Sequence, residues 1–150
     1  MLVSSRNIAY VLLIGAAVLL GACGTAQASE DTVAIQTLIL EAQGEGFEGM
    51  VAVGEVIRNR AFKGSRRVER VVMAPWQFSC WNDPSNAKFK LSQVSGQTWQ
   101  TASRAWEASK SSNLTKGSRH YHTKAVNPKW SRGVRPCAVI GAHKFYNNVK

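Results

Sequence analysis

Apolar residues recur every three or four positions in the first half of the chain, which is the spacing of an amphipathic helix. One apolar stripe runs over residues 33–42, and a second follows after Gly44 and Gly46. The stripes consist of Ile35, Leu38, Ile39 and Ala42, and then of Met50, Val53, Val56 and Ile57. Glycines interrupt helices, so the pattern predicts two helices joined by a bend, with Arg58 and Arg60 on the outer face of the second.

The middle of the chain gives weaker signals. "KGSRR" at 63–67 is typical of a turn, and "VERVVMAPWQFSCW" at 68–81 mixes β-branched residues, proline and aromatics, which favours a short strand or an extended loop. Residues 82–95 are polar and are predicted to form a long loop. A third helix follows, since Trp99, Ala102, Trp106 and Ser109 lie at helical spacing, and its two tryptophans are expected in the core.

The last third contains short alternating segments punctuated by Pro128, Pro136 and Gly141. "RHYH", "NPKW" and "RPCAVIGAHKFY" are typical of the strands of a small sheet. Helices followed by strands predict an α+β fold in a single small domain.

The N-terminus has the form of an export signal. Arg6 precedes an apolar run at 8–20, and small residues follow. "LGAC" at 20–23 has the form of a bacterial lipoprotein box, which predicts lipidation of Cys23, whereas "AQA" at 26–28 suits ordinary signal cleavage. An uncleaved anchor is a third interpretation, although about 20 apolar residues are usually needed to span a membrane. We expect a lipoprotein signal at 1–23, a tether at 24–31 and the folded domain at 32–150.

Export changes how the charge is interpreted. The chain has 19 basic and 9 acidic residues, and removal of Arg6 with the leader leaves 18 and 9, a formal charge of +9. A basic intracellular protein would suggest nucleic acid, but an exported one meets anionic wall polymers and lipid surfaces. A generic solubilising surface is the alternative.

Cys80 and Cys137 remain if Cys23 is lipidated or removed. A pair of cysteines in an oxidising compartment predicts a disulfide. Two free buried thiols are the alternative.

Four of the nine acidic residues fall between positions 41 and 55, namely Glu41, Glu45, Glu48 and Glu55. At helical spacing Glu41 and Glu45 lie together beside the first apolar stripe, and both are candidate catalytic residues: Glu41 as the acid, and Glu45 as its electrostatic partner or as a substrate-binding group. A carboxyl group at the border of an apolar surface is partly desolvated, and partial desolvation favours the protonated form that a general acid needs. Acids of this kind cleave glycosidic bonds. The alternative is that both side chains flank the helix in solvent.

"EAQGEGFEGMVAVGEVIRNR" at 41–60 resembles the signature of the SleB/CwlJ family of cell wall hydrolases, which opens with Glu-Ala-x-Gly-Glu and ends in Asn-Arg. "QFSCWND" at 77–83, "HYH" at 120–122, "NPKW" at 127–130 and "IGAHKF" at 140–145 are similar to later segments of the family in the same order. Gln43 stands where many members carry arginine. No segment resembles the separate peptidoglycan-binding domain of the spore enzymes, whose task is expected to pass to the lipid anchor or the basic surface.

The resemblance implies a lysozyme-like α+β catalytic domain that acts on the glycan strands of peptidoglycan, with Glu41 as the general acid. A hydrolase usually needs a second carboxyl group, whereas a lytic transglycosylase lets a hydroxyl of the sugar attack. Only Glu45 and Glu48 lie near Glu41 in the sequence, and the two aspartates are Asp31 and Asp83. We therefore expect a transglycosylase, with a muramidase as the alternative.

Aromatic side chains would contact the apolar faces of the sugars. Phe78, Trp81, Tyr121 and Trp130 are the candidates, each with core packing as the alternative. Asn82 is expected to bind an acetamido group or else to cap a turn.

The histidines allow one further hypothesis. His122 is a candidate for substrate binding beside Tyr121, and together with His120 and His143 it would suit the zinc site of an amidase. No further ligand occurs at a recognised spacing, so polar surface histidines without a metal or cofactor are expected. A wall-binding lipoprotein without catalytic activity is the remaining class.

Overall fold

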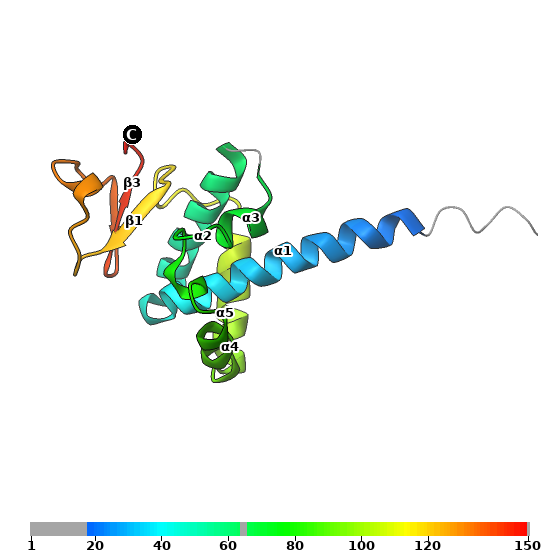
Figure 1. Ribbon diagram of the computed structural model, residues 1–150. Helices are drawn as coiled ribbons and strands as arrows, with labels where there is room; N and C mark the ends of the chain where they lie inside the picture. The colour runs from blue at the N-terminus through cyan, green and yellow to red at the C-terminus, as the bar shows by residue number, and fades with distance from the viewer. Residues whose placement is uncertain (1–17, 64–65, 150) are drawn as a thin grey trace, which may run out of the picture.

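The computed structural model describes residues 18–63 and 66–149, with side chains from Glu30 onward except that of Lys63. Its elements in chain order are α1 (Val18–Ala42), η1 (Gln43–Glu45), α2 (Gly46–Lys63), α3 (Val68–Val72), η2 (Ser79–Trp81), α4 (Pro84–Ser92), α5 (Gly96–Ala108), β1 (His120–Thr123), η3 (Lys129–Ser131), β2 (Ala138–Ile140) and β3 (His143–Tyr146). Helices come first and strands last, so the predicted α+β class is confirmed (Figure 1).

The first two predicted helices meet at the glycine bend as expected. The chain leaves α1 at Ala42, passes through the single turn η1, and reverses at Gly46, whose φ is 69°. Positive φ is costly for residues with a Cβ, which explains the glycine at this position. Leu38 and Ile39 of α1 and Val53 and Ile57 of α2 are fully buried against each other's helix and α5.

Trp106 of α5 is the largest fully buried side chain of the core, so its predicted place is confirmed, and Trp99 packs partly buried on the same cluster. The Trp106 indole Nε1 donates a hydrogen bond of 2.7 Å to Asp31. The Arg58 guanidinium stacks 3.5 Å from the ring centroid. Arg58 is therefore half-buried on this indole and is not a free surface cation.

The segment predicted to be a tether is helical. Residues 24–31 belong to α1, which extends away from the other elements at its N-terminal part (Figure 1). Two residues of this end of the helix contact the rest of the domain: Glu30 pairs with Arg67, and Asp31 bonds to the core tryptophan.

The leader is only partly covered by the structure. Residues 1–17 lie outside the described residues, as does the side chain of Cys23, the predicted lipidation site. Among the described helices, none is long and apolar enough to cross a membrane.

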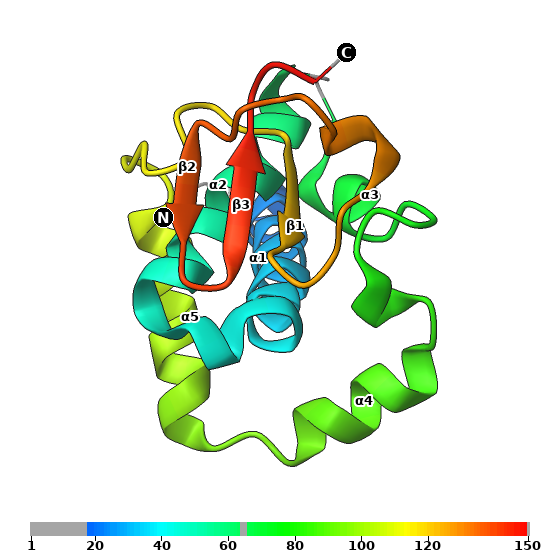
Figure 2. The ribbon, with the colours of Figure 1, turned by 90° about the vertical axis from the view of Figure 1, so that its left-hand side faces the viewer.

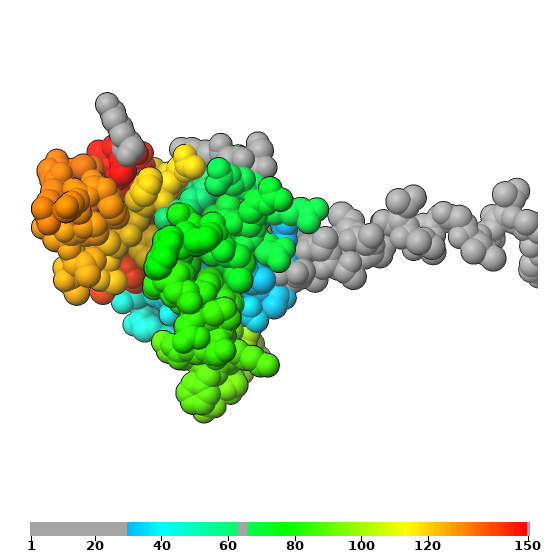
Figure 3. Space-filling view, viewed as in Figure 1, coloured from blue at the N-terminus to red at the C-terminus, as the bar shows by residue number. Residues whose placement is uncertain are grey.

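Two predictions for the middle of the chain are wrong. The valine-rich segment expected as a strand or loop contains α3, whose Val71 and Val72 are buried against the helices. The expected loop at 82–95 contains α4, which starts at an Asp83 N-cap followed by Pro84. Those two residues are a recognised helix start. In the space-filling view the α4 segment (green) projects from the rest of the described domain (Figure 3).

The strands form an antiparallel sheet in the order β1-β3-β2, and Figure 2 shows it lying in front of α1 and α2. Tyr121 pairs with Phe145, and both face the helices, where Phe145 packs on Ala52 and Val56 of α2. His122 faces the opposite way, toward Trp130 of the 124–136 segment. This alternation sets which residues of β1 reach the end of α1.

Candidate active site

The Glu41 carboxylate sits in the last turn of α1, half-buried, where three elements converge. Its Oε1 accepts hydrogen bonds from the Cys80 backbone N–H at 3.2 Å and the Ser79 hydroxyl at 3.4 Å. Its Oε2 accepts from the Tyr121 hydroxyl at 3.1 Å. The side chain is thus fixed from two sides, by η2 and by β1.

Tyr121 is a persistent donor to this carboxylate. Burial raises the pKa of its phenol, and the adjacent negative charge and hydrogen bond of Glu41 raise it further. The ring is held between Phe145, stacked at 5.7 Å, and His143, in edge contact at 5.2 Å. The hydroxyl therefore stays protonated and aimed at Glu41.

Glu45 is engaged by the sheet. Its Oε2 accepts a 2.7 Å hydrogen bond from the Ala142 N–H in the turn between β2 and β3. A Cβ added at Gly141 (φ 53°) would overlap the Glu45 carboxylate, and one added at Gly49 would overlap the Glu45 Cβ. Two glycines thus make room for this side chain, and its carboxylate anchors the hairpin to the end of α1.

Glu55 has a structural role that the sequence analysis did not predict. It is 4% exposed and accepts hydrogen bonds from the Leu114 and Thr115 N–H groups and from the Thr115 hydroxyl, at 2.7, 2.8 and 2.6 Å. This buried carboxylate fixes the loop that leads into β1. Glu48, by contrast, is exposed in the first turn of α2.

His143 of β3 lies next to the site, in edge contact with the Tyr121 ring. It is 4% exposed, and its Nδ1 has no hydrogen-bond partner. Desolvation and the neighbouring His122 lower the pKa of its ring, whereas the charges of Glu45 and Glu41 raise it. Desolvation is the largest of these effects, so the net pKa is lowered. A buried, largely neutral imidazole here corrects the expectation of a surface histidine.

His122 is also buried, at 7% exposure. Its ring nitrogens are within hydrogen-bond distance of the Thr123 carbonyl and the Tyr146 hydroxyl, and it stacks on the Tyr146 ring. It faces away from Glu41 and both of its ring nitrogens have partners within the protein, so these contacts give no support to the predicted substrate-binding role. Within the described part of the chain, no group of three or more His, Cys, Asp or Glu residues is arranged to hold a metal ion.

The predicted sugar-binding aromatics divide into buried and accessible ones. Phe78 is 2% exposed and packs in the core, as the packing alternative expects. Trp81 is half-buried, and its Nε1 donates to the Thr37 hydroxyl at 3.0 Å. Trp130 is 37% exposed over the outer face of the sheet. Asn82 is exposed at the C-terminal end of η2, where its backbone N–H donates to the Ser79 carbonyl.

Trp76 is an aromatic candidate that the sequence reasoning missed. It is 84% exposed and has a φ of 64°, which is uncommon for a residue with a bulky side chain. The loop carrying it leads directly into η2, which holds Glu41. The available signal was a tryptophan directly after Pro75, at a position where no helix or strand periodicity predicts that its ring is buried.

The predicted disulfide is wrong, and both thiols are free. Cys80 lies against Glu41, and burial together with that carboxylate raises the pKa of its thiol. Cys137 lies elsewhere, directly before β2, where its Sγ contacts the Thr115 carbonyl at 3.3 Å and the Ser118 hydroxyl at 3.0 Å. The two cysteines serve different parts of the fold.

A sequence profile of the cell wall hydrolase family matches residues 44–146. This match spans more than half of the chain, so the protein belongs to the cell wall hydrolase family, as its motifs predicted. Glu41 lies just before the matched range.

Among solved structures, the chain is similar to the catalytic domain of the Bacillus cereus SleB protein. The TM-score is 0.64 at 23% sequence identity, over 80% of this chain and 91% of that chain. At this identity the likeness concerns the fold, helices followed by a small antiparallel sheet. A comparison with curated proteins gave no match.

Proposed function

We propose that the protein is a peptidoglycan lytic transglycosylase with Glu41 as its general acid and base. The observation that carries this proposal is that Glu41 is held by Ser79, Cys80 and Tyr121 while its acidic neighbour Glu45 is bonded to the hairpin turn. Glu55 is buried against the loop before β1. A reaction that needs only one carboxyl group fits this distribution better than one that needs two.

In the proposed reaction the Glu41 carboxylic acid donates its proton to the oxygen that joins N-acetylmuramic acid to the next sugar. The C1–O bond breaks, and positive charge develops on C1 of the muramic acid. The Glu41 carboxylate then takes the proton of the C6 hydroxyl of the same sugar, and that oxygen bonds to C1. The products are a 1,6-anhydro sugar and a free hydroxyl, and no water is consumed.

Digestion of purified sacculi followed by mass spectrometry tests this proposal. We expect anhydromuramyl fragments from the wild type, at least a hundredfold fewer from Glu41→Gln, and an unchanged yield from the exposed control Glu48→Gln. Fragments with reducing ends would indicate a muramidase. Freed stem peptides would indicate an amidase and overturn both glycosidase interpretations.

A wall-binding lipoprotein without turnover is the second candidate, favoured by the basic composition of the chain. It requires that the wild type and Glu41→Gln bind sacculi equally and that neither releases fragments. A zinc amidase would lose its activity when a chelator removes the metal. We expect the release of wall fragments to be unchanged by chelators.

We further propose that the protein is exported and anchored through a lipid on Cys23, facing peptidoglycan and anionic wall polymers. The support is the leader with its "LGAC" segment. Labelling of cells with a fatty acid analogue should mark the wild type, and Cys23→Ser should abolish the label and release the protein from the membrane fraction. Release of a label-free wild type by cleavage after "AQA" would overturn this assignment.

A further inference from the structure

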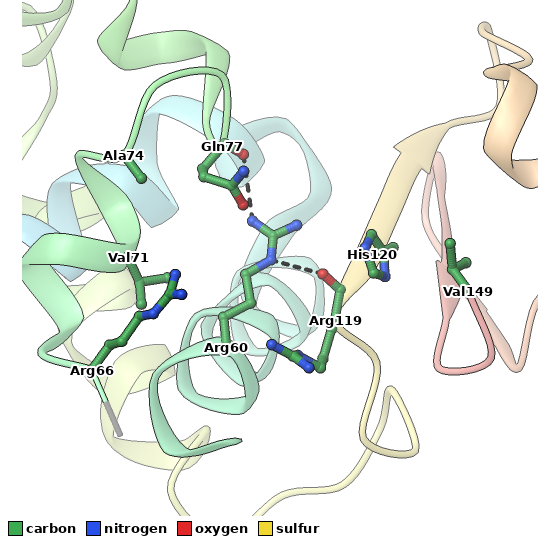
Figure 4. Close-up of a pocket in the computed structure, with 8 residues that line it drawn as sticks. All are labelled: Arg60, Arg66, Val71, Ala74, Gln77, Arg119, His120 and Val149. Carbon is green, nitrogen blue, oxygen red and sulfur yellow. Dashed lines mark hydrogen bonds between the residues drawn. The ribbon is translucent and has the colours of Figure 1, made fainter. Parts of the chain in front are cut away.

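A pocket of about 340 Å³ lies next to the Glu41 site and is lined by basic side chains. Figure 4 shows Arg60 of α2 at its centre, with Arg66 and Val71 on one side and Arg119 and His120 at the start of β1 on the other. Among the described residues, its lining contains three arginines and a histidine and no acidic side chain. Such a pocket suits an anion.

Arg60 is the fixed element of this pocket. Its Nε donates to the Arg119 carbonyl at 2.7 Å and its Nη1 to the Gln77 carbonyl at 3.4 Å, and its guanidinium lies over the Phe78 ring at 5.1 Å. A guanidinium has five N–H donors, so three remain for a ligand. A planar fork held in this way is suited to a carboxylate.

Among the described residues, no carboxylate forms an ion pair with an arginine of the pocket. The ion pairs found among the described residues join Arg67 to Glu30 and Lys110 to Glu107, and none includes a pocket arginine. Desolvation lowers the pKa of Arg60, and the charge of Arg119 lowers it further, whereas Tyr121 and Glu41 act in the opposite direction and raise it. Desolvation and both arginines also lower the pKa of His120.

The pocket adjoins the proposed catalytic acid along two segments. Gln77 precedes the η2 turn that holds Glu41, and His120 precedes Tyr121, which donates to Glu41. An anion in this pocket would therefore belong to a group attached to the sugar being cut.

We infer that this pocket binds a carboxylate of the peptide that peptidoglycan carries on its muramic acid residues. The inference rests on the proposed function, because it is the sugar at Glu41 that would bring the peptide to the pocket. The lactyl-linked peptide is joined covalently to that sugar and bears free carboxylates, whereas a phosphodiester of a separate wall polymer would have to arrive independently. The pocket would thus select strands that still carry their peptides.

Arg119→Gln tests the inference, because it removes the guanidinium and keeps the backbone carbonyl that holds Arg60. Two substrates are compared, peptide-bearing strands and strands stripped of peptides by an amidase. We expect KM to rise about tenfold on peptide-bearing strands and to stay unchanged on stripped strands. Arg70→Gln, on α3 and outside the pocket, is the charge-matched control and should change neither.

An equal loss on both substrates, or the same loss in Arg70→Gln, would overturn the inference. A binding measurement separates it from the proposed reaction: a soluble muramyl peptide is titrated into the protein while the His120 ring is followed by NMR. Binding of the muramyl peptide should raise the pKa of His120. Arg119→Gln should weaken the binding of that peptide. Both results are expected even if the protein cuts no glycan. Equal binding of a peptide with amidated carboxylates, or tighter binding of a glycerol phosphate polymer, would refute the peptide assignment.

Discussion

Replacement of Glu55 by glutamine tests whether a buried acid of the motif region serves the fold. The carboxylate is 4% exposed and receives donors only: two backbone N–H groups and one hydroxyl from Leu114 and Thr115. A glutamine amide keeps the shape but replaces one acceptor oxygen with an NH₂ group. That group would face an N–H or O–H donor, so one hydrogen bond is lost and the remaining ones no longer involve a charge.

The magnitude follows from these contacts. A hydrogen bond to a charged group contributes roughly 1.5–3 kcal/mol, and an unsatisfied buried donor costs a further 1–3 kcal/mol. We expect Glu55→Gln to lower the free energy of unfolding by about 3 kcal/mol. For a domain of this size about 1 kcal/mol corresponds to roughly 4 °C, so the midpoint should fall by about 12 °C.

Thermal and urea unfolding, followed by circular dichroism, measure this difference. Glu48→Gln is the matched control, since it makes the same chemical change at an exposed position of the same helix, and should stay within about 0.5 kcal/mol of the wild type. Equal stability of the two variants would refute the argument that Glu55 holds the loop before β1. Loss of glycan release by Glu55→Gln below its unfolding temperature would show that the loop also aligns Tyr121.

Three further outcomes are expected. Gly141→Ala should lose at least about 1 kcal/mol more stability than Gly133→Ala in urea unfolding. Both glycines have positive φ, but only a Cβ at position 141 would overlap the Glu45 carboxylate. Equal losses in the two variants would contradict this. Burial lowers the pKa of His143, so protonation of this ring below the unfolded-state pKa of about 6.5 favours the unfolded protein, and stability is lost as pH falls. His143→Gln removes this titration and should therefore lose less stability than the wild type between pH 7 and pH 5. Parallel curves of unfolding free energy against pH for the two proteins would refute this expectation. Tyr121→Phe should slow glycan release about tenfold with a stability loss of about 1 kcal/mol, since it removes a donor to Glu41; an unchanged rate would exclude a positioning role.

Periodicity was sufficient for the helices that bury a continuous stripe. The stripe at 50–57 and the tryptophans of α5 point inward as predicted, because each helix packs on one side only. The short helices α3 and α4 were missed for different reasons. Val68–Val72 has strand propensity that tertiary packing overrides, whereas Pro84–Ser92 has little apolar periodicity and is marked mainly by its cap.

The candidate site was predictable only where it coincided with the motif. Glu41 was found from its place beside an apolar stripe and from the family resemblance. The burial of His122 and Phe78, and the separation of the two cysteines, depend on which face of β1 meets the helices and on where distant segments dock. Alternation along a strand gives the two faces but not which of them packs inward, so these contacts required the structure.

The concentration of acids between 41 and 55 has a common explanation in the fold. Glu41, Glu45 and Glu55 each accept hydrogen bonds from the C-terminal part of the chain, namely from Tyr121 in β1, from the turn before β3 and from the loop before β1. The helical hairpin thus presents three carboxylates to the donors of one small sheet. Two of them fasten the sheet, and this holds the tyrosine against the third. The geometry of the proposed catalytic acid therefore depends on how firmly its two neighbours attach the sheet to the helices.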